Sequence, residues 1–484
     1  MVATPFGISY QVNVDAAGNN ISGDAANEPS LCIDPTNPQR IAVGWRQFDT
    51  TNSNFRQGGW GYSTNGGLTW NFGGKLQTNV FRSDPVLAAD AEGGFYYLSL
   101  MIPPEGYLCD MWHSTNGGAT WQLLGRAVGG DKSWMAIDTT SGPGRGTIYQ
   151  AWDSSSVTSN RDFSFSYDGG LTWTNPFVIP QGPYWGTLDV GPAGEVYLIG
   201  WDGSQFWLNR STNAPNRGVP FVFDLTVPVD LGGGLLYFLG FGPNPGGLIG
   251  QVWTAVDRST NATRGNVYAL CSVGNAINLS DIMLARSTDG GFTWQPPIRI
   301  NTDAAFTNAW HWFGTLSVAP NGRVDVCWFD TRNDPANIVS ELFYCYSLDG
   351  GLTWVTNRAV SPPFNSQLGF PNQNKIGDYI GMISLDDAAC IAYSATFNGE
   401  QDIYFLRLDQ PIVASIDRSG SAVRLSWNAT PGKNYCLQYK SILTAPWPVG
   451  TNQVCLVATN TVMTISDPLL PGSATRFYRV VKEP

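Results

Sequence analysis

The stretch Ser347-Leu-Asp-Gly-Gly-Leu-Thr-Trp354 decides the fold, because it is one of five copies of the same eight-residue phrase. The other copies are Ser63-Thr-Asn-Gly-Gly-Leu-Thr-Trp70, Ser114-Thr-Asn-Gly-Gly-Ala-Thr-Trp121, Ser166-Tyr-Asp-Gly-Gly-Leu-Thr-Trp173 and Ser287-Thr-Asp-Gly-Gly-Phe-Thr-Trp294. Asn/Asp-Gly-Gly supplies a turn whose backbone needs positive φ, and the Asn or Asp side chain bonds nearby amides. Thr-Trp then re-enters a strand with a large apolar anchor. The repeated phrase therefore predicts a repeat architecture built from hairpins.

The phrase resembles the Asp-box, Ser-x-Asp-x-Gly-x-Thr-Trp, of bacterial neuraminidases (sialidases) and related β-propellers. The resemblance implies an all-β Asp-box β-propeller in which each box is a structural turn between the third and fourth strands of a blade. The boxes start at residues 63, 114, 166, 287 and 347, so the interval between the third and fourth is about twice the others. One blade has therefore lost its box, and the stretch Arg210-Ser-Thr-Asn-Ala-Pro-Asn-Arg-Gly218 fits as its remnant.

Short apolar runs that suit the innermost strand of a blade recur seven times. They span residues 29–34, 85–90, 134–138, 185–190, 252–257, 313–318 and 379–384. We therefore expect seven blades within residues 1–410, with six as the alternative count. The last repeat lacks a fourth strand, while the N-terminal run Ile8–Val14 has no assigned place. We expect that run to complete the last blade and close the ring.

The pattern changes in residues 411–484, where alternating strands are separated by turns. The predicted strands span residues 423–427, 435–439, 454–457, 462–465 and 477–481. This part resembles a small fibronectin-III or immunoglobulin-like β-sandwich. Cys436 and Cys455 either pair or stay free, whereas most other cysteines sit in apolar strands and are expected to be buried.

Bulk properties exclude several partners. The net charge of −11, without a basic cluster, argues against nucleic acid. No run of 18 apolar residues exists, so we expect no membrane insertion. The start Met1-Val-Ala-Thr-Pro5 is not a signal peptide, yet the composition is typical of export, so we expect a secreted, periplasmic or cell-surface protein and a monomer.

The sialidase resemblance implies a definite site on the face opposite the boxes. Three arginines would clamp a substrate carboxylate, because the planar guanidinium matches it bidentately. The clamp would be formed by Arg46, Arg82 and Arg332. Tyr379 would be the nucleophile, Glu28 or Glu400 its partner and Asp84 the acid. The Phe-Arg-Ile-Pro signature of that family should precede the boxes, whereas the nearest string, Phe81-Arg-Ser-Asp-Pro85, follows the first box.

Two other function classes stay open beside an exported sialidase-like glycoside hydrolase that acts on terminal acidic sugars. In a propeller-type polysaccharide lyase, His311 or Tyr379 would remove the proton next to a uronate carboxylate, and Lys132 would stabilise the enolate. A non-catalytic propeller would bind a glycan by stacking on tryptophans at the loop ends. The candidate stacking residues are Trp134, Trp185, Trp310 and Trp312.

Metal dependence is the last expectation. None of the three functions requires a cofactor. Asp330, Asp334 and Asp402 are candidates for a structural calcium ion because Ca²⁺ takes oxygen ligands, although their spacing matches no recognised calcium loop.

Overall fold

The computed structural model describes residues 1–4, 6–153, 157–275, 278–305, 308–410, 414–419, 422–429, 432–442, 444, 453–460, 462–468 and 476–482. Every regular element in these ranges is a β-strand, so the predicted all-β class is confirmed. The chain divides into two compact units, residues 1–385 with 389–408, and residues 386–388 with 409–484. The described ranges contain no helix that is long and apolar enough to cross a membrane.

The described part of the first unit consists of seven small antiparallel sheets. The first four, each given from its first strand outward, are β3 (Ala25–Ile33), β4 (Ile41–Phe48), β5 (Gln57–Ser63) and β6 (Asn71–Lys75); β7 (Ser83–Ala89), β8 (Phe95–Met101), β9 (Leu108–Ser114) and β10 (Gln122–Arg126); β11 (Trp134–Ile137), β12 (Ile148–Ala151) and β13 (Phe163–Ser166); and β14 (Tyr184–Val190), β15 (Val196–Trp201), β16 (Phe206–Ser211) and β17 (Leu225–Val229).

The remaining three sheets of this unit carry additional short strands. They are β19 (Trp253–Val256), β20 (Val267–Gly274), β21 (Asp281–Ser287) and β22 (Ile298–Arg299), with β18 (Gly234–Leu235) also on β20; β23 (His311–Val318), β24 (Val324–Asp330), β25 (Val339–Ser347) and β26 (Arg358–Ala359), with β27 (Phe364–Asn365) also on β25; and β28 (Gly381–Ser384), β29 (Ala388–Ala395), β30 (Asp402–Asp409), β2 (Gly7–Gln11) and β1 (Val2–Thr4).

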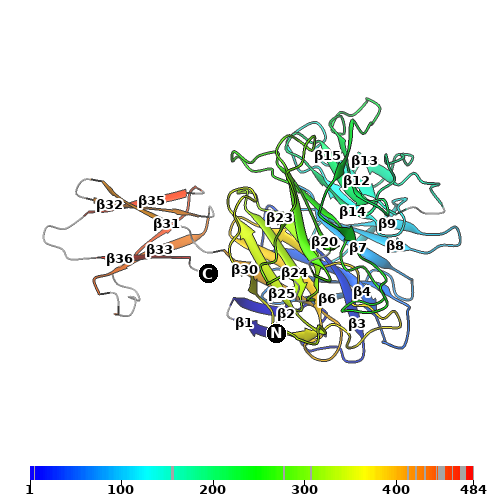
Figure 1. Ribbon diagram of the computed structural model, residues 1–484, viewed down its shortest axis with the longest axis horizontal. Helices are drawn as coiled ribbons and strands as arrows, with labels where there is room; N and C mark the ends of the chain where they lie inside the picture. Colours follow the sequence, from blue (N-terminus) through cyan, green and yellow to red (C-terminus); the bar gives the residue numbers. More distant parts are fainter. Residues whose placement is uncertain are drawn as a thin grey trace. The chain divides into compact units, whose positions relative to one another are not determined.

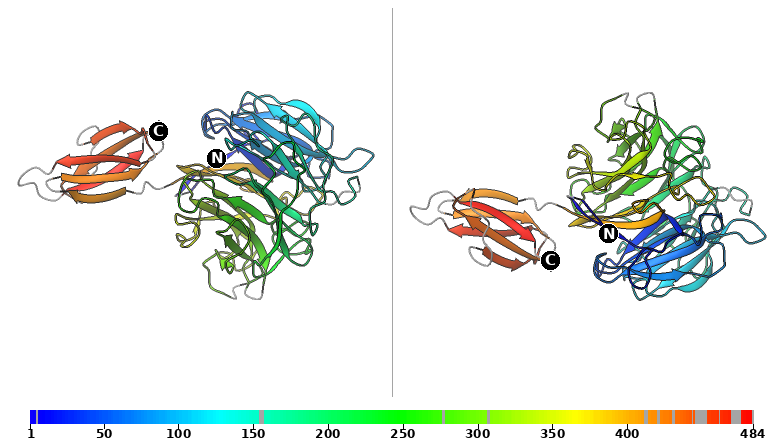
Figure 2. Two further views of the ribbon diagram at one scale, coloured as in Figure 1. Left: turned by 90° about the horizontal axis from the view of Figure 1, so that it is seen from above. Right: turned by 90° about the horizontal axis from the view of Figure 1, so that it is seen from below.

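The seven sheets close into a ring. The first strand of each sheet lies beside the first strand of the next, and β28 of the last sheet lies beside β3 of the first. These first strands coincide with the seven predicted innermost runs. The predicted closure by the N-terminus is also confirmed, because β2 pairs with β30 and sets Tyr10 opposite Phe405. Figures 1 and 2 show the blue N-terminal strands beside the orange end of this unit.

Each of the five repeated phrases forms a turn that starts at the last residue of a third strand. In the copy that follows β25, Ser347 Oγ donates to Asp349 Oδ1 at 2.8 Å and accepts a hydrogen bond from Gly351 N. Asp349 also accepts from Thr353 N at 2.8 Å. The other four copies repeat these bonds. The phrases are thus self-contained structural turns.

The predicted remnant of a sixth phrase occupies the matching place after β16. Ser211 Oγ donates to Asn213 Oδ1 at 3.0 Å, which is the first bond of the intact turn. Asn213 Oδ1 then accepts from Val222 N instead of a threonine amide. The position is therefore retained although the Gly-Gly and Thr-Trp parts are lost.

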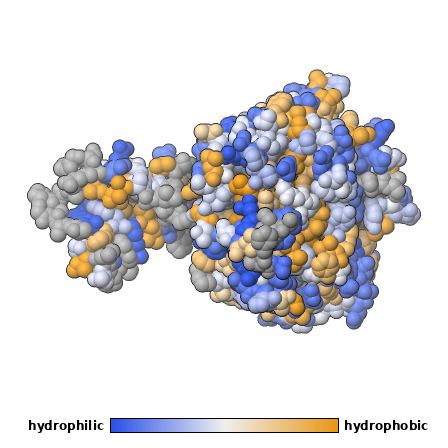
Figure 3. Space-filling model, in the orientation of Figure 1, coloured by the Kyte–Doolittle hydropathy of each residue, from blue (hydrophilic) through white to orange (hydrophobic). Residues whose placement is uncertain are grey.

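Buried aromatic and aliphatic side chains fill the space between neighbouring sheets. Trp45, Trp312 and Trp328 are almost completely buried in three of these clusters. Burying such side chains stabilises the fold by about 2–3 kcal/mol each. On the face in Figure 3, the exposed hydrophobic residues form separate patches among hydrophilic ones.

The second unit contains two three-stranded antiparallel sheets in its described part. One consists of β31 (Ala414–Ser419), β32 (Ala422–Asn428) and β35 (Val462–Pro468), and the other of β34 (Gln453–Val457), β33 (Asn434–Lys440) and β36 (Phe477–Lys482). Trp427 and Tyr435 lie in the core of this unit. A disulfide joins Cys436 to Cys455, which settles the pairing that the sequence left open. The six cysteines of the first unit are buried.

Candidate functional site

The site begins with a backbone irregularity that recurs around the ring. In β3, β7, β14 and β23 the ladder to the second strand shifts register near the start of the first strand. A non-glycine residue with positive φ stands at each shift, and another stands just before β11. These residues are Glu28, Asp84, Trp185, Phe313 and Lys132. Such backbone costs on the order of 1–3 kcal/mol per residue and is concentrated at functional sites, where bulges re-aim side chains.

Three of these positions carry charged side chains that meet at one end of the ring. Lys132 Nζ lies 3.8 Å from Asp84 Oδ2 and 3.9 Å from Glu28 Oε1, and it forms an ion pair with Asp378. Arg46 Nε lies 3.1 Å from Glu28 Oε2. We call this group, with Lys375, the axial charge cluster.

Lys375 completes the axial charge cluster from the loop before β28. Its Nζ lies 2.5 Å from Asp378 Oδ2 and 3.6 Å from Glu28 Oε1. Three carboxyl groups thus face three cations. All six side chains are at least nine-tenths buried, so each charge depends on its neighbours rather than on water.

The environment drives the pKa values of the carboxyl groups apart. Burial raises the pKa of Glu28 to about 7 although Arg46 and Lys132 oppose this shift. Burial also acts on Asp84, but the charges of Lys132 and Arg46 hold its pKa well below the ordinary value. Near pH 7 Glu28 is therefore only partly ionised while Asp84 is fully ionised, which is the division of roles used in acid–base catalysis.

The pKa values of the two lysines are also shifted in opposite directions. Burial disfavours the charge of Lys132, but Asp378, Asp84 and Glu28 outweigh it and raise the pKa well above its usual range. Burial lowers the pKa of Lys375, and the positive charge of Lys132 counters the effect of Asp378. Lys132 is therefore a permanent cation.

An aromatic layer lies against the axial charge cluster. The ring of Trp134 packs edge-on against Trp253 and Tyr379, with centroids 5.0 and 5.3 Å apart. Tyr379 is buried and its hydroxyl donates to Pro85 O at 2.9 Å. Burial, together with the charges of Glu28 and Asp84, raises its pKa well above the usual range. The predicted nucleophile is thus a neutral phenol that already has an acceptor.

A cavity of about 160 Å³ borders this aromatic layer. Trp134 and Trp253 contribute to its wall, together with Asp189, Thr254 and Arg258 from the middle and far ends of the first strands. Arg258 is paired with Asp189 at 2.7 Å.

A hairpin from the fifth sheet packs over the axial charge cluster. In residues 236–249, which we call the capping hairpin, Phe238 N donates to Gly247 O and Ile249 N to Leu236 O. Leu236 is anchored against the hydrophobic core.

Side chains of the capping hairpin hold the loop before β28. Asn244 is fully buried and its Nδ2 donates to Gly377 O at 2.9 Å. Leu248 N donates to Asp378 Oδ1 at 2.9 Å. Gly377 lies against Glu28, where a Cβ atom would stand only 2.7 Å from Glu28 Cγ. The hairpin thus closes the cluster over Asp378 and, through Gly377, over Glu28.

The three predicted clamp arginines do not converge. Arg46 belongs to the axial charge cluster, whereas Arg82 NH2 pairs with Asp110 Oδ2 at 2.8 Å. Arg332 NH2 pairs with Asp330 Oδ2 at 2.6 Å. Each guanidinium therefore already has its own carboxylate, and the assembled three-arginine clamp is absent from the described contacts of these residues.

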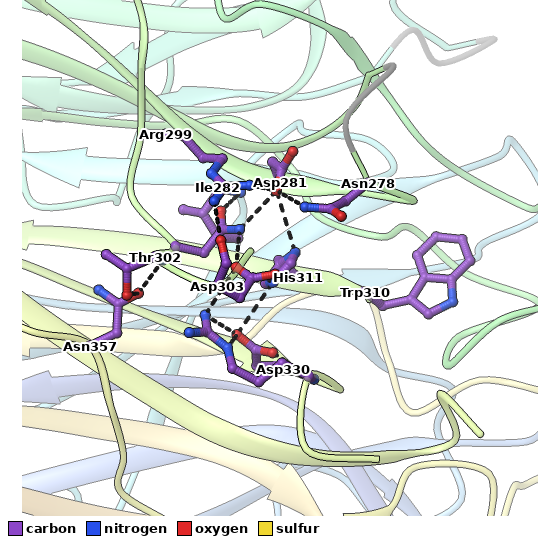
Figure 4. Close-up of polar contacts among 12 residues, drawn as sticks. Asn278, Asp281, Ile282, Arg299, Thr302, Asp303, Trp310, His311, Asp330 and Asn357 are labelled. Carbon is purple, nitrogen blue, oxygen red and sulfur yellow. Dashed lines mark hydrogen bonds and ion pairs between the residues drawn. The ribbon is translucent and has the colours of Figure 1, made fainter. Parts of the chain in front are cut away.

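His311, Asp303 and Asp330 belong to a second polar cluster, shown in Figure 4. Arg332 joins this cluster through its ion pair with Asp330. His311 is fully buried; its Nδ1 lies 2.6 Å from Ser280 O and its Nε2 lies 3.1 Å from Asp303 Oδ1. Burial disfavours its charge, but Asp303 and Asp330 outweigh this and raise its pKa. A protonated imidazole has no lone pair for removing a proton, so this geometry suits an ion pair better than the predicted lyase base.

The predicted tryptophan platforms and calcium ligands lie in different surroundings. Trp134 lines the aromatic layer, and Trp185 is half-buried beside Lys132 in a small pocket. Trp310 and Trp312 are buried.

The three aspartates proposed for calcium do not share a site. Asp330 accepts from Arg332, Asp334 accepts from backbone amides of residues 336, 338 and 339, and Asp402 accepts from Asn13. In the described part of the chain no group of three or more His, Cys, Asp and Glu side chains has the geometry to hold a metal ion.

Lys375, Asp378 and Asn244 have no role in the prediction from the sequence. Position was the available signal for the two charged residues, because Asp378 directly precedes a predicted innermost run, as Glu28 and Asp84 do, and Lys375 lies three residues earlier. Nothing in the sequence around Asn244 indicated that a distant hairpin would reach the same end of the ring.

No family model and no curated protein matches the chain. A protein of unknown function from Dyadobacter fermentans DSM 18053 is similar in structure with a TM-score of 0.48 and 14% identity, over 84% of this chain and all of that one. A fungal alcohol oxidase of the AA5 family, solved with copper, gives a TM-score of 0.48 and 11% identity over 99% of both chains. At these values neither likeness carries an inference about this chain.

Proposed function

We propose that the first unit is a seven-bladed Asp-box β-propeller and that it acts as an exported glycoside hydrolase. The closed ring of seven sheets and the five identical turns support the architecture. For the second unit we propose a fibronectin-III or immunoglobulin-like accessory sandwich, supported by its two small antiparallel sheets.

The observation that carries the activity is the pair formed by Glu28 and Asp84. One oxygen atom of each carboxyl group lies within 4 Å of Lys132 Nζ. These two oxygen atoms can therefore be no farther apart than the sum of their distances to Nζ. That limit permits both the spacing of about 5–5.5 Å used by retaining enzymes and the shorter end of the range, about 6.5–9.5 Å, used by inverting enzymes. Their pKa values are displaced in opposite directions, as an acid and a base or nucleophile require.

In the proposed reaction Glu28 donates its proton to the glycosidic oxygen as the bond from that oxygen to the anomeric carbon breaks. The Asp84 carboxylate either attacks the anomeric carbon or activates the attacking water, and the products together gain one water molecule. Lys132 stays charged throughout and keeps Asp84 ionised. Substrate reaches the pair when the capping hairpin moves away from Asp378, since both carboxyl groups are buried and the hairpin closes over Glu28 through Gly377.

The test is mass spectrometry of products from a pool of neutral, sialylated and uronate-containing glycans. Products that gain water support hydrolysis, whereas unsaturated uronates would indicate a lyase and contradict the proposal. Glu28→Gln should lower turnover by about 10²–10⁴-fold for a poor leaving group and much less for an aryl glycoside that needs no acid. Glu105→Gln, which changes an exposed carboxylate outside the cluster, is the matched control.

A non-catalytic glycan-binding function is the second candidate. It is favoured by one observation, namely that every charge in the axial charge cluster is paired and enclosed. Unchanged glycans after prolonged incubation, together with measurable binding, would select it.

A further inference from the structure

Five aromatic side chains lie on the fourth sheet and the capping hairpin. Trp185 is the centre of four of them: its ring lies 4.8 Å from that of Tyr184, 4.5 Å from that of Tyr237 and 6.1 Å from that of Phe238. Phe241, three residues after Phe238 in the hairpin, adds an exposed ring that lies 6.0 Å from that of Trp310. We call these five residues the aromatic platform.

The outer part of this platform is open to solvent although its rings are large and apolar. Tyr237, Phe238 and Phe241 are 38%, 54% and 59% exposed. Trp185 and Phe238 both have positive φ, a backbone state that is a rare outlier for bulky residues. Exposed aromatic rings held in strained backbone are typical of a binding surface rather than of chance exposure.

Hydrogen bonds fix the platform from beneath. The ladder of the capping hairpin holds Phe238 through its amide, and Gln367 Nε2 donates to Gly242 O at 2.8 Å next to Phe241. The surface is therefore organised before any ligand arrives, which lowers the entropy lost on binding.

The charges around the platform decide which ligand suits it. Residues 181–209 and 229–252, which carry all five rings, contain no Lys or Arg. Burial raises the pKa of Tyr184, and the charge of Asp202 adds to this effect, so the platform lies near negative charge. Lys132 lines a small pocket with Trp185, but it already faces three carboxyl groups. A sugar carboxylate would therefore gain little from this cation, whereas a neutral sugar ring would lose nothing.

We propose that the aromatic platform binds a neutral polysaccharide whose sugar rings stack on Trp185, Tyr237, Phe238 and Phe241. The inference deepens the proposed function, because it names a neutral glycan where the family resemblance implied an acidic one. The platform also adjoins the candidate site, since Trp185 and Lys132 line one small pocket of about 10 Å³, room for one water molecule. A chain bound on the platform therefore lies beside the axial charge cluster.

The test is affinity electrophoresis of the full chain in gels that contain xylan, mixed-linkage β-glucan or galactomannan, with polygalacturonate and hyaluronate as acidic probes. At least one neutral polysaccharide should retard the protein and the acidic ones should not. The double variant Phe238→Asn with Phe241→Ser should bind at least tenfold more weakly, because the two exposed rings are lost while asparagine tolerates the left-handed backbone. Phe292→Ser removes an equally exposed ring, 58%, from an Asp-box turn and should bind as the wild type does.

Thermal melting checks that each variant is folded. Retardation by acidic polysaccharides alone, no retardation in any neutral gel, or equal retardation of the double variant would overturn the proposal. Glu28→Gln separates this proposal from the hydrolase. If that variant and the wild type bind alike and neither cleaves, the platform stands and the hydrolase fails. If aryl glycosides are cleaved but no neutral polysaccharide binds, only the platform fails.

Discussion

Replacing Lys132 by methionine should destabilise the protein more than any exposed charge removal. The ammonium group contacts three carboxyl groups, at 3.8 Å for Asp84, at 3.9 Å for Glu28 and in an ion pair with Asp378. Methionine keeps the apolar stem of the side chain and removes the charge. Because breaking a buried ion pair leaves an uncompensated charge, we expect a loss of about 3–5 kcal/mol in the free energy of unfolding.

The matched control is Lys75→Met. Lys75 Nζ lies 2.5 Å from Asp49 Oδ1, but the Asp49 side chain is 54% exposed. An exposed pair of this kind contributes about 0–1 kcal/mol. Both variants lose one lysine from the first unit. They therefore have the same net charge and an unchanged second unit.

The assay is equilibrium unfolding in guanidinium chloride at pH 7, followed by far-ultraviolet circular dichroism. The midpoint should fall clearly for Lys132→Met and hardly for Lys75→Met, with a similar dependence on denaturant. Equal losses in the two variants would refute the argument that the axial charge cluster depends on Lys132.

The stability difference between wild type and Lys132→Met should also depend on pH, in a direction that the pKa shifts predict. The pKa of Lys132 is raised, so its contribution is complete below about pH 10 and disappears only as the pH rises through the folded-state value. The pKa values of Asp84 and Asp378 are lowered, so their contribution is present above about pH 4 and disappears as the pH falls through the folded-state values. The difference between wild type and Lys132→Met should therefore be largest in the neutral to mildly alkaline range and narrow in acid.

Three further predictions follow from single groups. Tyr379→Phe should cost about 1–3 kcal/mol, because Pro85 O loses its buried donor, and should retain turnover within about tenfold; complete loss of turnover in a folded variant would restore Tyr379 as the nucleophile. His311→Gln should flatten the pH dependence of stability above about pH 6.5. The raised pKa of His311 stabilises the folded state at lower pH, and this contribution disappears as the pH rises through the folded-state pKa. Melting curves of wild type and variant from about pH 5 to 9 measure the effect, and a parallel pH dependence in the two proteins would contradict it. Asp349→Ala should cost about 1–2 kcal/mol in denaturant unfolding without altering glycan binding, since the hydrogen bonds that the structure describes for Asp349 lie within its own turn; altered binding would disprove a purely structural turn.

Local chemistry explains the part of the fold that could be predicted from the sequence. Each repeated turn bonds within eight residues, so Ser347, Asp349 and Thr353 specify their turn without help from distant parts of the chain. The apolar runs between the turns are equally local, and their number predicted seven sheets. Even the long-range pairing of β2 with β30 followed from counting strands. The last repeat lacked its fourth strand, and one N-terminal strand had no assigned place.

The axial charge cluster shows where local reasoning reached its limit. The sequence marked Glu28, Asp84 and Lys132 as polar residues before buried strands, and the ring geometry brings these three together. It also placed Arg332 at the same end of the ring, in the loop after a second strand, yet that residue pairs with Asp330 in another cluster. Position in a repeat predicts the end of the ring at which a side chain lies, but not its partner.

By itself the sequence determined the all-β class, the five turns and the strands that surround them, because hydrogen bonds and apolar patterns within a few residues specify each of them. Only the tertiary structure decided that Lys132 would compensate three carboxyl groups, that the Tyr379 hydroxyl would be occupied by Pro85 O and that a hairpin with exposed aromatic rings would close the site. These features depend on Coulomb interactions and contacts between residues 48 to 294 positions apart, and the dielectric environment that sets their strength exists only once the ring has closed.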